Sequence, residues 1–276
     1  MLTLFDAIRV DLDVAYAAMT LLWAAGLLIA SLEQLFGWRR YLPAGTYSWR
    51  ILGSRAWLHR HPRAARVVAA LLDWPGIVVL CAVQAIALAV ILATPNDALV
   101  SRIAVCFVAA FLLTLHFRNG FGDDGADQMS AVIALPLVFH ALVPASRTIA
   151  FAGLLFVGAQ ACLSYLASGI SKAVSPIWRS GRAIFGIMNT RSYGSARMAA
   201  LLRDRPHLNR ALAWSVFGIE ALFPLVLFAP QPIALALLAW GVSFHLFCAG
   251  AMGLNSFVWA FTATYPALLH LRGLLG

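Results

Sequence analysis

The sequence predicts an all-α fold, a polytopic integral membrane helical bundle with about eight transmembrane helices. Of its 276 residues, 62% are hydrophobic and 11% are charged, whereas soluble domains carry about 25% charged residues. Mean hydropathy is +0.84, and apolar stretches of about 20 residues, the length that a helix needs to cross a bilayer, recur along the chain. We therefore expect one membrane domain over residues 1–276, with no loop long enough for a soluble domain.

Short polar or proline-containing connections separate the apolar segments, as in a bundle whose neighbouring spans are linked by tight turns. The residues before the first span are more acidic than basic, the reverse of a signal-peptide n-region, so we expect that span to be retained. The last segment directly follows Gly253 and is interpreted as either a span or a re-entrant segment. The eight candidate spans are residues 14–32, 75–93, 98–117, 129–145, 148–171, 211–228, 232–252 and 254–271.

Two basic loops, residues 33–66 and 173–210, set the expected orientation. Each holds seven arginines, and the positive-inside rule places both at the cytoplasm, so eight spans put the N- and C-termini outside. Aromatic and apolar residues are interleaved with these arginines, a pattern typical of short helices on an anionic membrane surface. The simpler interpretation is positive-inside anchoring with an aromatic belt. The sequence pI of about 10.1 thus indicates membrane lipids and their anionic headgroups as partners, and no nucleic acid.

One lysine stands out against nineteen arginines. Lys172 ends a polar stripe on the fifth span, in which Tyr165, Ser168 and Lys172 recur on one side at helical spacing. An amine releases its proton far more readily than a guanidinium, so Lys172 is a candidate base, and Tyr165 and Ser168 are candidate substrate- or cofactor-binding residues. Two alternatives stay open: a lysine at a helix end can snorkel to the headgroups, and hydroxyls can bond between helices.

Two further ionisable side chains lie inside predicted spans, where each is costly unless it is paired or hydrated. Glu220, one of two glutamates, falls near the middle of the sixth span, and His245 falls in the second half of the seventh, with Asn255 beyond it. We take Glu220 and His245 as candidate catalytic residues and Asn255 as a candidate binding residue. The alternatives are a buried charge pair between helices for Glu220 and a hydrogen-bonded core histidine for His245.

An acidic, glycine-rich connection covers residues 116–128. Asp123, Asp124 and Asp127 are weak candidates for binding a divalent cation, because the spacing of a calcium-binding loop is absent. A helix-capping turn at the start of the fourth span is the simpler interpretation, and we predict no bound metal. The four cysteines lie singly inside apolar stretches, so we expect neither a disulfide nor a zinc site.

The order of these residues resembles a known family. The stretch Tyr-Leu-Ala-Ser-Gly-Ile-Ser-Lys at residues 165–172, Trp178 with a glycine three positions later, Glu220, and the Phe-His pair at His245 are similar to the membrane domain of the vitamin K-dependent gamma-carboxylases. They resemble more closely its bacterial relatives, the horizontally transferred transmembrane (HTTM) proteins. The resemblance covers roughly residues 115–265. It implies an integral protein of the bacterial inner (cytoplasmic) membrane and adds Trp178 to the binding residues.

The resemblance also implies a function. Lys172 falls on the carboxylase base that deprotonates a reduced, vitamin K-like quinone, His245 falls on a pocket histidine, and Glu220 falls on an acidic position that we expect to position other groups. In that family the quinol anion takes up dioxygen, and a glutamate of the substrate then loses a proton and captures carbon dioxide. We therefore expect lysine-base chemistry on a quinol-like or peptide substrate in an intramembrane pocket, with a reduced quinone as cofactor. The cytoplasmic position expected for Lys172 favours a lipidic substrate over protein carboxylation.

Other classes of function remain open. A proton-coupled transporter would use Glu220 and Lys172 to relay protons, although the sequence has no evident inverted repeat or paired broken helices. An immunity or peptide-maturation accessory protein would need no catalytic residue, and in a purely structural protein the polar side chains would only join helices. A carboxylate in contact with Lys172 would oppose its role as a free base, so contact between Lys172 and Glu220 is decisive.

Overall fold

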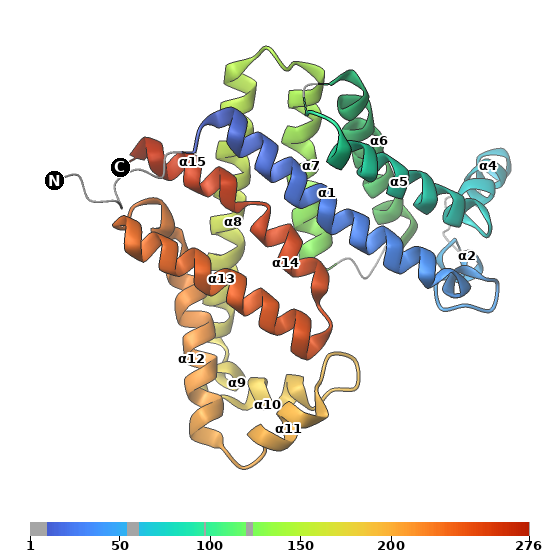
Figure 1. The fold of residues 1–276 in the computed structure, drawn as a ribbon. Coiled ribbons are helices and arrows are strands. Elements are labelled where there is room, and N and C mark those ends of the chain that lie inside the picture. The colour runs from blue at the N-terminus through green and yellow to red at the C-terminus, as the bar shows by residue number, and fades with distance from the viewer. Residues whose placement is uncertain (1–9, 54–60, 97, 120–123, 276) are drawn as a thin grey trace. The chain divides into compact units, whose positions relative to one another are not determined.

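The computed structural model describes residues 10–53, 61–96, 98–119 and 124–275. These residues form α-helices and short 3-10 helices and contain no strand (Figure 1). The chain divides into two compact units: unit 1 consists of Met1–Met19 and Phe151–Gly276, and unit 2 consists of Thr20–Ala150. Both units contain helices long enough to cross a membrane. The single membrane domain over residues 1–276 stays a prediction.

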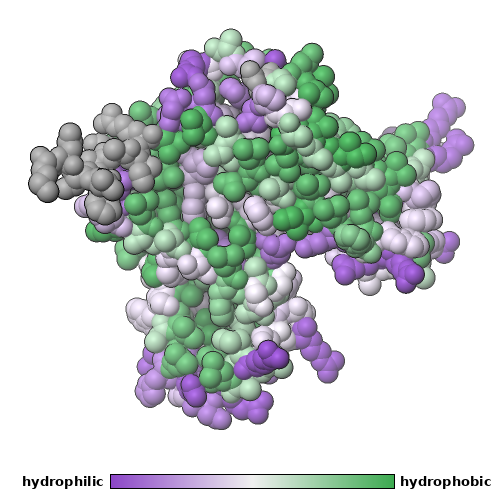
Figure 2. Space-filling model, viewed as in Figure 1, coloured by the Kyte–Doolittle hydropathy of each residue, from purple (hydrophilic) through white to green (hydrophobic). Residues whose placement is uncertain are grey.

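Seven helices in the described part of the chain are long and apolar enough to cross a membrane, which confirms the predicted all-α polytopic fold. Apolar side chains also cover much of the visible surface (Figure 2), as expected where lipid rather than water surrounds the helices. The seven are α1 (Leu12–Phe36), α5 (Gly76–Ala93), α6 (Leu99–Asn119), α7 (Gly125–Leu142), α8 (Arg147–Val174), α12 (Pro206–Leu222) with the 3-10 helix η2 (Phe223–Leu227), and α13 (Gln231–Met252).

The segment predicted as the eighth span, residues 254–271, forms two shorter helices instead. These are α14 (Asn255–Thr262) and α15 (Tyr265–Leu275), which are joined by a turn. Pro266 explains the break, because it has no N–H to donate to the carbonyl of Thr262 and its ring would clash there in a continuous helix. In the first turn of α15 the missing N–H costs nothing. α15 packs against η2 within unit 1.

Unit 2 is built on α5, α6 and α7, which pack against one another in chain order. Near the end of α6, the buried Arg118 donates hydrogen bonds to the carbonyl oxygens of Leu72 at 3.0 Å and Tyr47 at 2.6 Å. Its guanidinium also lies over the rings of Tyr41 and Trp49. Arg118 thereby ties the described part of the predicted basic loop 33–66 to the bundle. The short helices of this region are η1 (Trp38–Tyr41), α2 (Trp49–Leu52) and α4 (Pro62–Leu72).

The second predicted basic loop, residues 173–210, lies in unit 1 and also contains short helices. All seven of its arginines are exposed, and hydrophilic side chains gather at this end of the unit in Figure 2. Ala199 and Leu202 are buried in a cluster with Met188, which fixes two of the helices together. The contact of both basic loops with anionic headgroups stays a prediction. The helices are α9 (Pro176–Arg179), α10 (Arg182–Met188) and α11 (Ala196–Leu202).

Candidate functional site

The candidate functional residues continue the buried faces of three helices in unit 1. On α8 a buried stripe runs through Leu154, Val157 and Ala161 to Tyr165, and Lys172 lies two turns further on the same face. The buried residues of α12 and α13 also recur at helical spacing, so their polar members face the protein and not the lipid. They are Asn209, Ala213, Phe217 and Glu220 on α12, and Ala234, Leu238, Gly241 and His245 on α13.

Gly169 lets α8 and α12 approach each other closely. A Cβ at this position would lie 2.5 Å from the backbone nitrogen of Ala221, which no side chain tolerates without a shift of the backbone. Glu220 precedes Ala221, and Lys172 lies three residues after Gly169. The glycine therefore allows the backbone approach that brings the carboxylate of Glu220 to the amine of Lys172.

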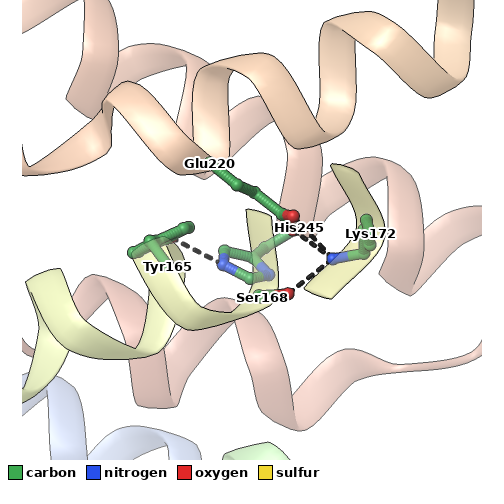
Figure 3. Close-up of polar contacts among 5 residues, drawn as sticks. All are labelled: Tyr165, Ser168, Lys172, Glu220 and His245. Atoms are coloured by element: carbon green, nitrogen blue, oxygen red, sulfur yellow. Dashed lines mark hydrogen bonds and ion pairs between the residues drawn. The ribbon is translucent and has the colours of Figure 1, made fainter. Parts of the chain in front are cut away.

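Lys172 and Glu220 form an ion pair (Figure 3). Nζ of Lys172 donates to the two carboxylate oxygens of Glu220 at 2.7 and 2.6 Å, and to Oγ of Ser168 at 2.5 Å. The Lys172 side chain is 18% exposed and the Glu220 side chain 4%, so the pair is largely shielded from solvent. The ring of Trp178 on α9 lies 5.3 Å from Nζ, within cation–π range. As an ammonium group, Nζ thus uses all three of its N–H donors.

A second polar chain, a series of hydrogen-bonded side chains, begins at Tyr165, two turns before Lys172 on α8. The hydroxyl of Tyr165 is 2.8 Å from Nε2 of His245 and 3.2 Å from the hydroxyl of Tyr265, and all three side chains are buried. Gly241, one turn before His245, leaves room for these hydroxyls, because a Cβ there would collide with the hydroxyl of Tyr265. Nδ1 of His245 has no hydrogen-bond partner among the described residues. In Figure 3 the imidazole ring lies between Tyr165 and the ion pair.

Aromatic rings enclose this second chain. Tyr165 stacks on Phe223 of η2 with ring centroids 3.8 Å apart. The imidazole of His245 stacks on Phe261 at 4.7 Å and on Phe257 at 6.1 Å, both from α14. Stacked rings hold the orientation of the polar atoms that they carry. The site therefore combines an ion pair, an oriented imidazole and flat apolar surfaces.

An ammonium and a carboxylate in contact can move protons in two ways. The carboxylate of Glu220 can accept a proton, and the amine of Lys172 can release one. A lone charge so shielded from solvent would be strongly disfavoured, whereas the pair is neutral as a whole. The arrangement is thus suited to transferring a proton to or from a polar group that enters the site.

The structure brings most of the predicted site residues together. Asn255 is the first residue of α14, the helix that carries the two phenylalanines against His245. Tyr265 was not among the predicted residues, and the sequence gives no spacing signal for it, because it lies 100 positions from Tyr165 within an apolar segment. The predicted residues that take part in the contacts above are Tyr165, Ser168, Lys172, Trp178, Glu220 and His245.

The acidic connection before α7 is built as a helix cap. A carboxylate oxygen of Asp124 accepts from the backbone N–H groups of Ala126 at 2.8 Å and Asp127 at 3.0 Å. The side chain of Asp127 accepts in return from the backbone N–H of Asp124 at 3.3 Å, which completes a capping box. Asp123 lies outside the described residues. Within the described ranges no group of three or more His, Cys, Asp or Glu side chains could hold a metal ion.

Comparisons of the chain with family models, with curated proteins and with solved structures found no match. The function is therefore inferred from the chemistry of the ion pair and of the second polar chain beside it.

Proposed function

We propose that the protein is an integral membrane enzyme of the HTTM type in the bacterial cytoplasmic membrane, which uses Lys172 to remove a proton from a quinol-like or peptide substrate. The contact of Lys172 with Glu220 opposes a role as a free base, so the amine and the carboxylate are proposed to act together, and the buried contact of Lys172 with Glu220 and Ser168 is the observation that carries the proposal. Ionisable groups within a membrane bundle are costly, and their default interpretation is functional. His245 and Glu220 support the reaction. The binding residues are Tyr165, Ser168, Trp178 and Asn255.

Glu220 gives the pair a place to hold a proton. Because Lys172 donates three hydrogen bonds as an ammonium, it first passes a proton from Nζ to a carboxylate oxygen of Glu220. The neutral amine then takes a proton from the substrate, and the pair ends as an ammonium beside a carboxylic acid. Ser168 keeps its hydrogen bond to Nζ and so holds the amine in place. An arginine could not take the first step, because its guanidinium does not release a proton in proteins.

The residues around the pair fit a reduced quinone as cofactor. Phe257, Phe261 and Trp178 offer flat rings on which a quinone ring can stack. Nδ1 of His245 is a buried polar atom with no partner in the described chain, as expected of a position that a ligand oxygen occupies. These four residues would hold the ring, and Lys172 would take the proton. When bound, the reduced quinone supplies an acidic hydroxyl and two electrons.

The proposal includes the orientation of the chain. Seven arginines in each basic loop favour a cytoplasmic position for residues 33–66 and 173–210, and therefore for the Lys172 end of α8. Both termini then lie outside, with α14 and α15 together returning the chain across the bilayer. A reporter enzyme that is active only outside the cytoplasm, fused to the C-terminus, tests this. Activity of the fusion supports the orientation, and inactivity of an expressed fusion contradicts it.

Mass spectrometry of co-purifying lipids tests the enzyme proposal. The purified protein, Lys172→Ala and His245→Leu are extracted and their quinones are quantified per protein, with Gly218→Ala as the matched control because a Cβ there meets nothing within 4 Å. We expect wild type and Gly218→Ala to retain quinone, and the other two variants to lose it. No enrichment over an unrelated membrane protein purified identically contradicts the proposal. Equal retention in all four proteins would place any quinone elsewhere.

A second candidate is a proton-coupled transporter, which the ion pair between two helices of the bundle favours. Glu220 and Lys172 would then pass protons to an ion or solute that crosses the membrane. Proteoliposomes that carry a pH gradient and a pH-sensitive dye inside distinguish the two. Proton flux that wild type shows and Glu220→Gln lacks, without any quinone turnover, would favour transport over the enzyme.

A further inference from the structure

Helix α4 (Pro62–Leu72) has an apolar face that the described residues of unit 2 leave exposed. One side of the helix is used within unit 2, where Leu72 is buried with Trp49. On another side Val67 is 63% exposed and Leu71 is 50% exposed, one turn apart. A helix that buries one stripe in protein and exposes a second apolar stripe is typical of a helix with a further partner.

The chain itself places α4 at the edge of the membrane. Only Asp73, Trp74 and Pro75 separate it from α5, which begins at Gly76 and is apolar enough to cross the bilayer. Trp74 stacks on Trp38 with centroids 5.1 Å apart. Both rings remain more than a third exposed, as is typical of tryptophans at a membrane interface. The partner nearest to the exposed face of α4 is therefore the headgroup layer of the bilayer that α5 enters.

The charges of α4 favour anionic lipid. The helix carries Arg63 and Arg66, both exposed, and no acidic residue. Arg63 lies in the first turn, where the helix dipole disfavours a cation, so it does not serve the stability of the helix itself. Nearby, the guanidinium of Arg39 lies 5.7 Å from the Trp38 ring. Cations beside an apolar stripe are the arrangement with which interfacial helices bind anionic membranes.

We propose that α4 lies in the headgroup layer and forms a binding site for anionic phospholipids. Val67 and Leu71 insert between the upper parts of the acyl chains, and Arg63 and Arg66 bind the headgroup phosphates. The Trp38–Trp74 stack anchors the adjoining turn at the same depth. This site is independent of the ion pair in unit 1, and its failure or success leaves the proposed function untouched.

Native mass spectrometry of the full chain in detergent measures the lipid preference. The protein is titrated with phosphatidylglycerol and with phosphatidylcholine of equal chain length, and the ratio of the two binding constants is compared between wild type and Arg63→Gln/Arg66→Gln. The control is Arg63→Lys/Arg66→Lys, which keeps both positive charges at the same exposed positions. We expect the preference for phosphatidylglycerol to fall roughly tenfold in Arg63→Gln/Arg66→Gln and much less in the control. An unchanged preference, or an equal loss in both, overturns the proposal.

Insertion is measured separately in nanodiscs that contain phosphatidylglycerol. A fluorescent label on Leu71→Cys, with Cys106 and Cys248 replaced by serine, is quenched by lipids that carry a nitroxide near the headgroup. The same labelled protein in nanodiscs without the nitroxide lipid is the control. We expect quenching at position 71 only with the nitroxide lipid, unchanged by excess free glycerol phosphate. No quenching at 71, or displacement by glycerol phosphate, would show that α4 does not lie in the lipid.

Discussion

Nζ of Lys172 contacts both carboxylate oxygens of Glu220, a residue 48 positions later in the chain. The pair links α8 to α12 at the point where Gly169 lets the two backbones meet. Both side chains are largely shielded from solvent, so removal of one charge leaves the other uncompensated. The pair is therefore a structural link and a candidate reaction centre at once, and different variants are needed to separate the two roles.

Removing one charge should cost more stability than removing both. We expect Glu220→Gln to lower the free energy of unfolding by about 2 kcal/mol, less than for a fully buried pair because Lys172 is partly exposed. The double variant Lys172→Met/Glu220→Leu should recover most of this loss, since no charge is left without a partner. Unfolding in detergent, followed for wild type, Lys172→Met, Glu220→Leu and the double variant, measures the coupling. Losses that simply add would contradict a structural link.

Gly169 should tolerate no side chain. In Gly169→Ala the new Cβ would lie 2.5 Å from the backbone nitrogen of Ala221, so α8 and α12 must separate and the ion pair must lengthen. We expect the free energy of unfolding to fall by about 2 kcal/mol, as is typical of an overpacked helix contact. Gly218→Ala is the matched control, because its Cβ meets nothing within 4 Å and alanine favours the helix. Equal melting temperatures for the two variants would show that the close approach is unimportant.

Tyr165 should matter more than Tyr265. Tyr165→Phe removes the hydroxyl beside Nε2 of His245 and leaves both ring nitrogens without a partner in the described chain. We expect this to lower the free energy of unfolding by about 1–2 kcal/mol. Tyr265→Phe keeps the contact between Tyr165 and His245 and should cost less. Thermal unfolding of both variants gives the order. A larger loss in Tyr265→Phe would mean that the hydroxyl contact at 3.2 Å is the stronger of the two.

High pH should weaken unit 2 through Tyr41. Burial raises the pKa of this hydroxyl from 10.0 to about 12. The unfolded chain therefore ionises first, so the stabilisation is complete below pH 10 and is lost as the pH rises toward 12. Tyr41→Phe should remove this dependence. Between pH 9 and pH 11 its free energy of unfolding should therefore fall by about 1 kcal/mol less than that of wild type. Tyr193→Phe, at an exposed position, is the control. Identical pH profiles for all three proteins would contradict the effect.

Apolar length and helical spacing carried most of the prediction of the fold. The first seven spans needed only composition, because no backbone other than a helix satisfies its hydrogen bonds in so apolar a segment. The eighth segment is divided at Pro266 into α14 and α15, because a proline interrupts a continuing helix but is tolerated in the first turn of a new one. The periodic Tyr165 and Lys172 on α8 were predictable for the same reason as the spans, since a polar stripe at helical spacing has no place against lipid.

Contacts between distant segments could not be predicted. Nothing in the spacing of Lys172 and Glu220 says that they touch, because that depends on how closely two helices approach. Gly169, between Tyr165 and Lys172, is the one usable signal among these residues, since a small residue at a helix contact permits that approach. Tyr265 and Phe261 offered no such signal, because tyrosine and phenylalanine are common in any apolar segment and their role depends on where α14 and α15 fold back.

The central claim is that Lys172 moves a proton, and Lys172→Arg tests it most directly. Arginine keeps a positive charge beside Glu220, so the fold should survive, but it cannot pass on its proton. The measurement is the oxygen-dependent oxidation of vitamin K1 hydroquinone by protein in proteoliposomes, with thermal unfolding of the same samples. We predict that the rate of hydroquinone oxidation by Lys172→Arg falls to that of empty liposomes, while the melting temperature of the variant stays close to that of wild type. Wild-type turnover by a folded Lys172→Arg would contradict the account.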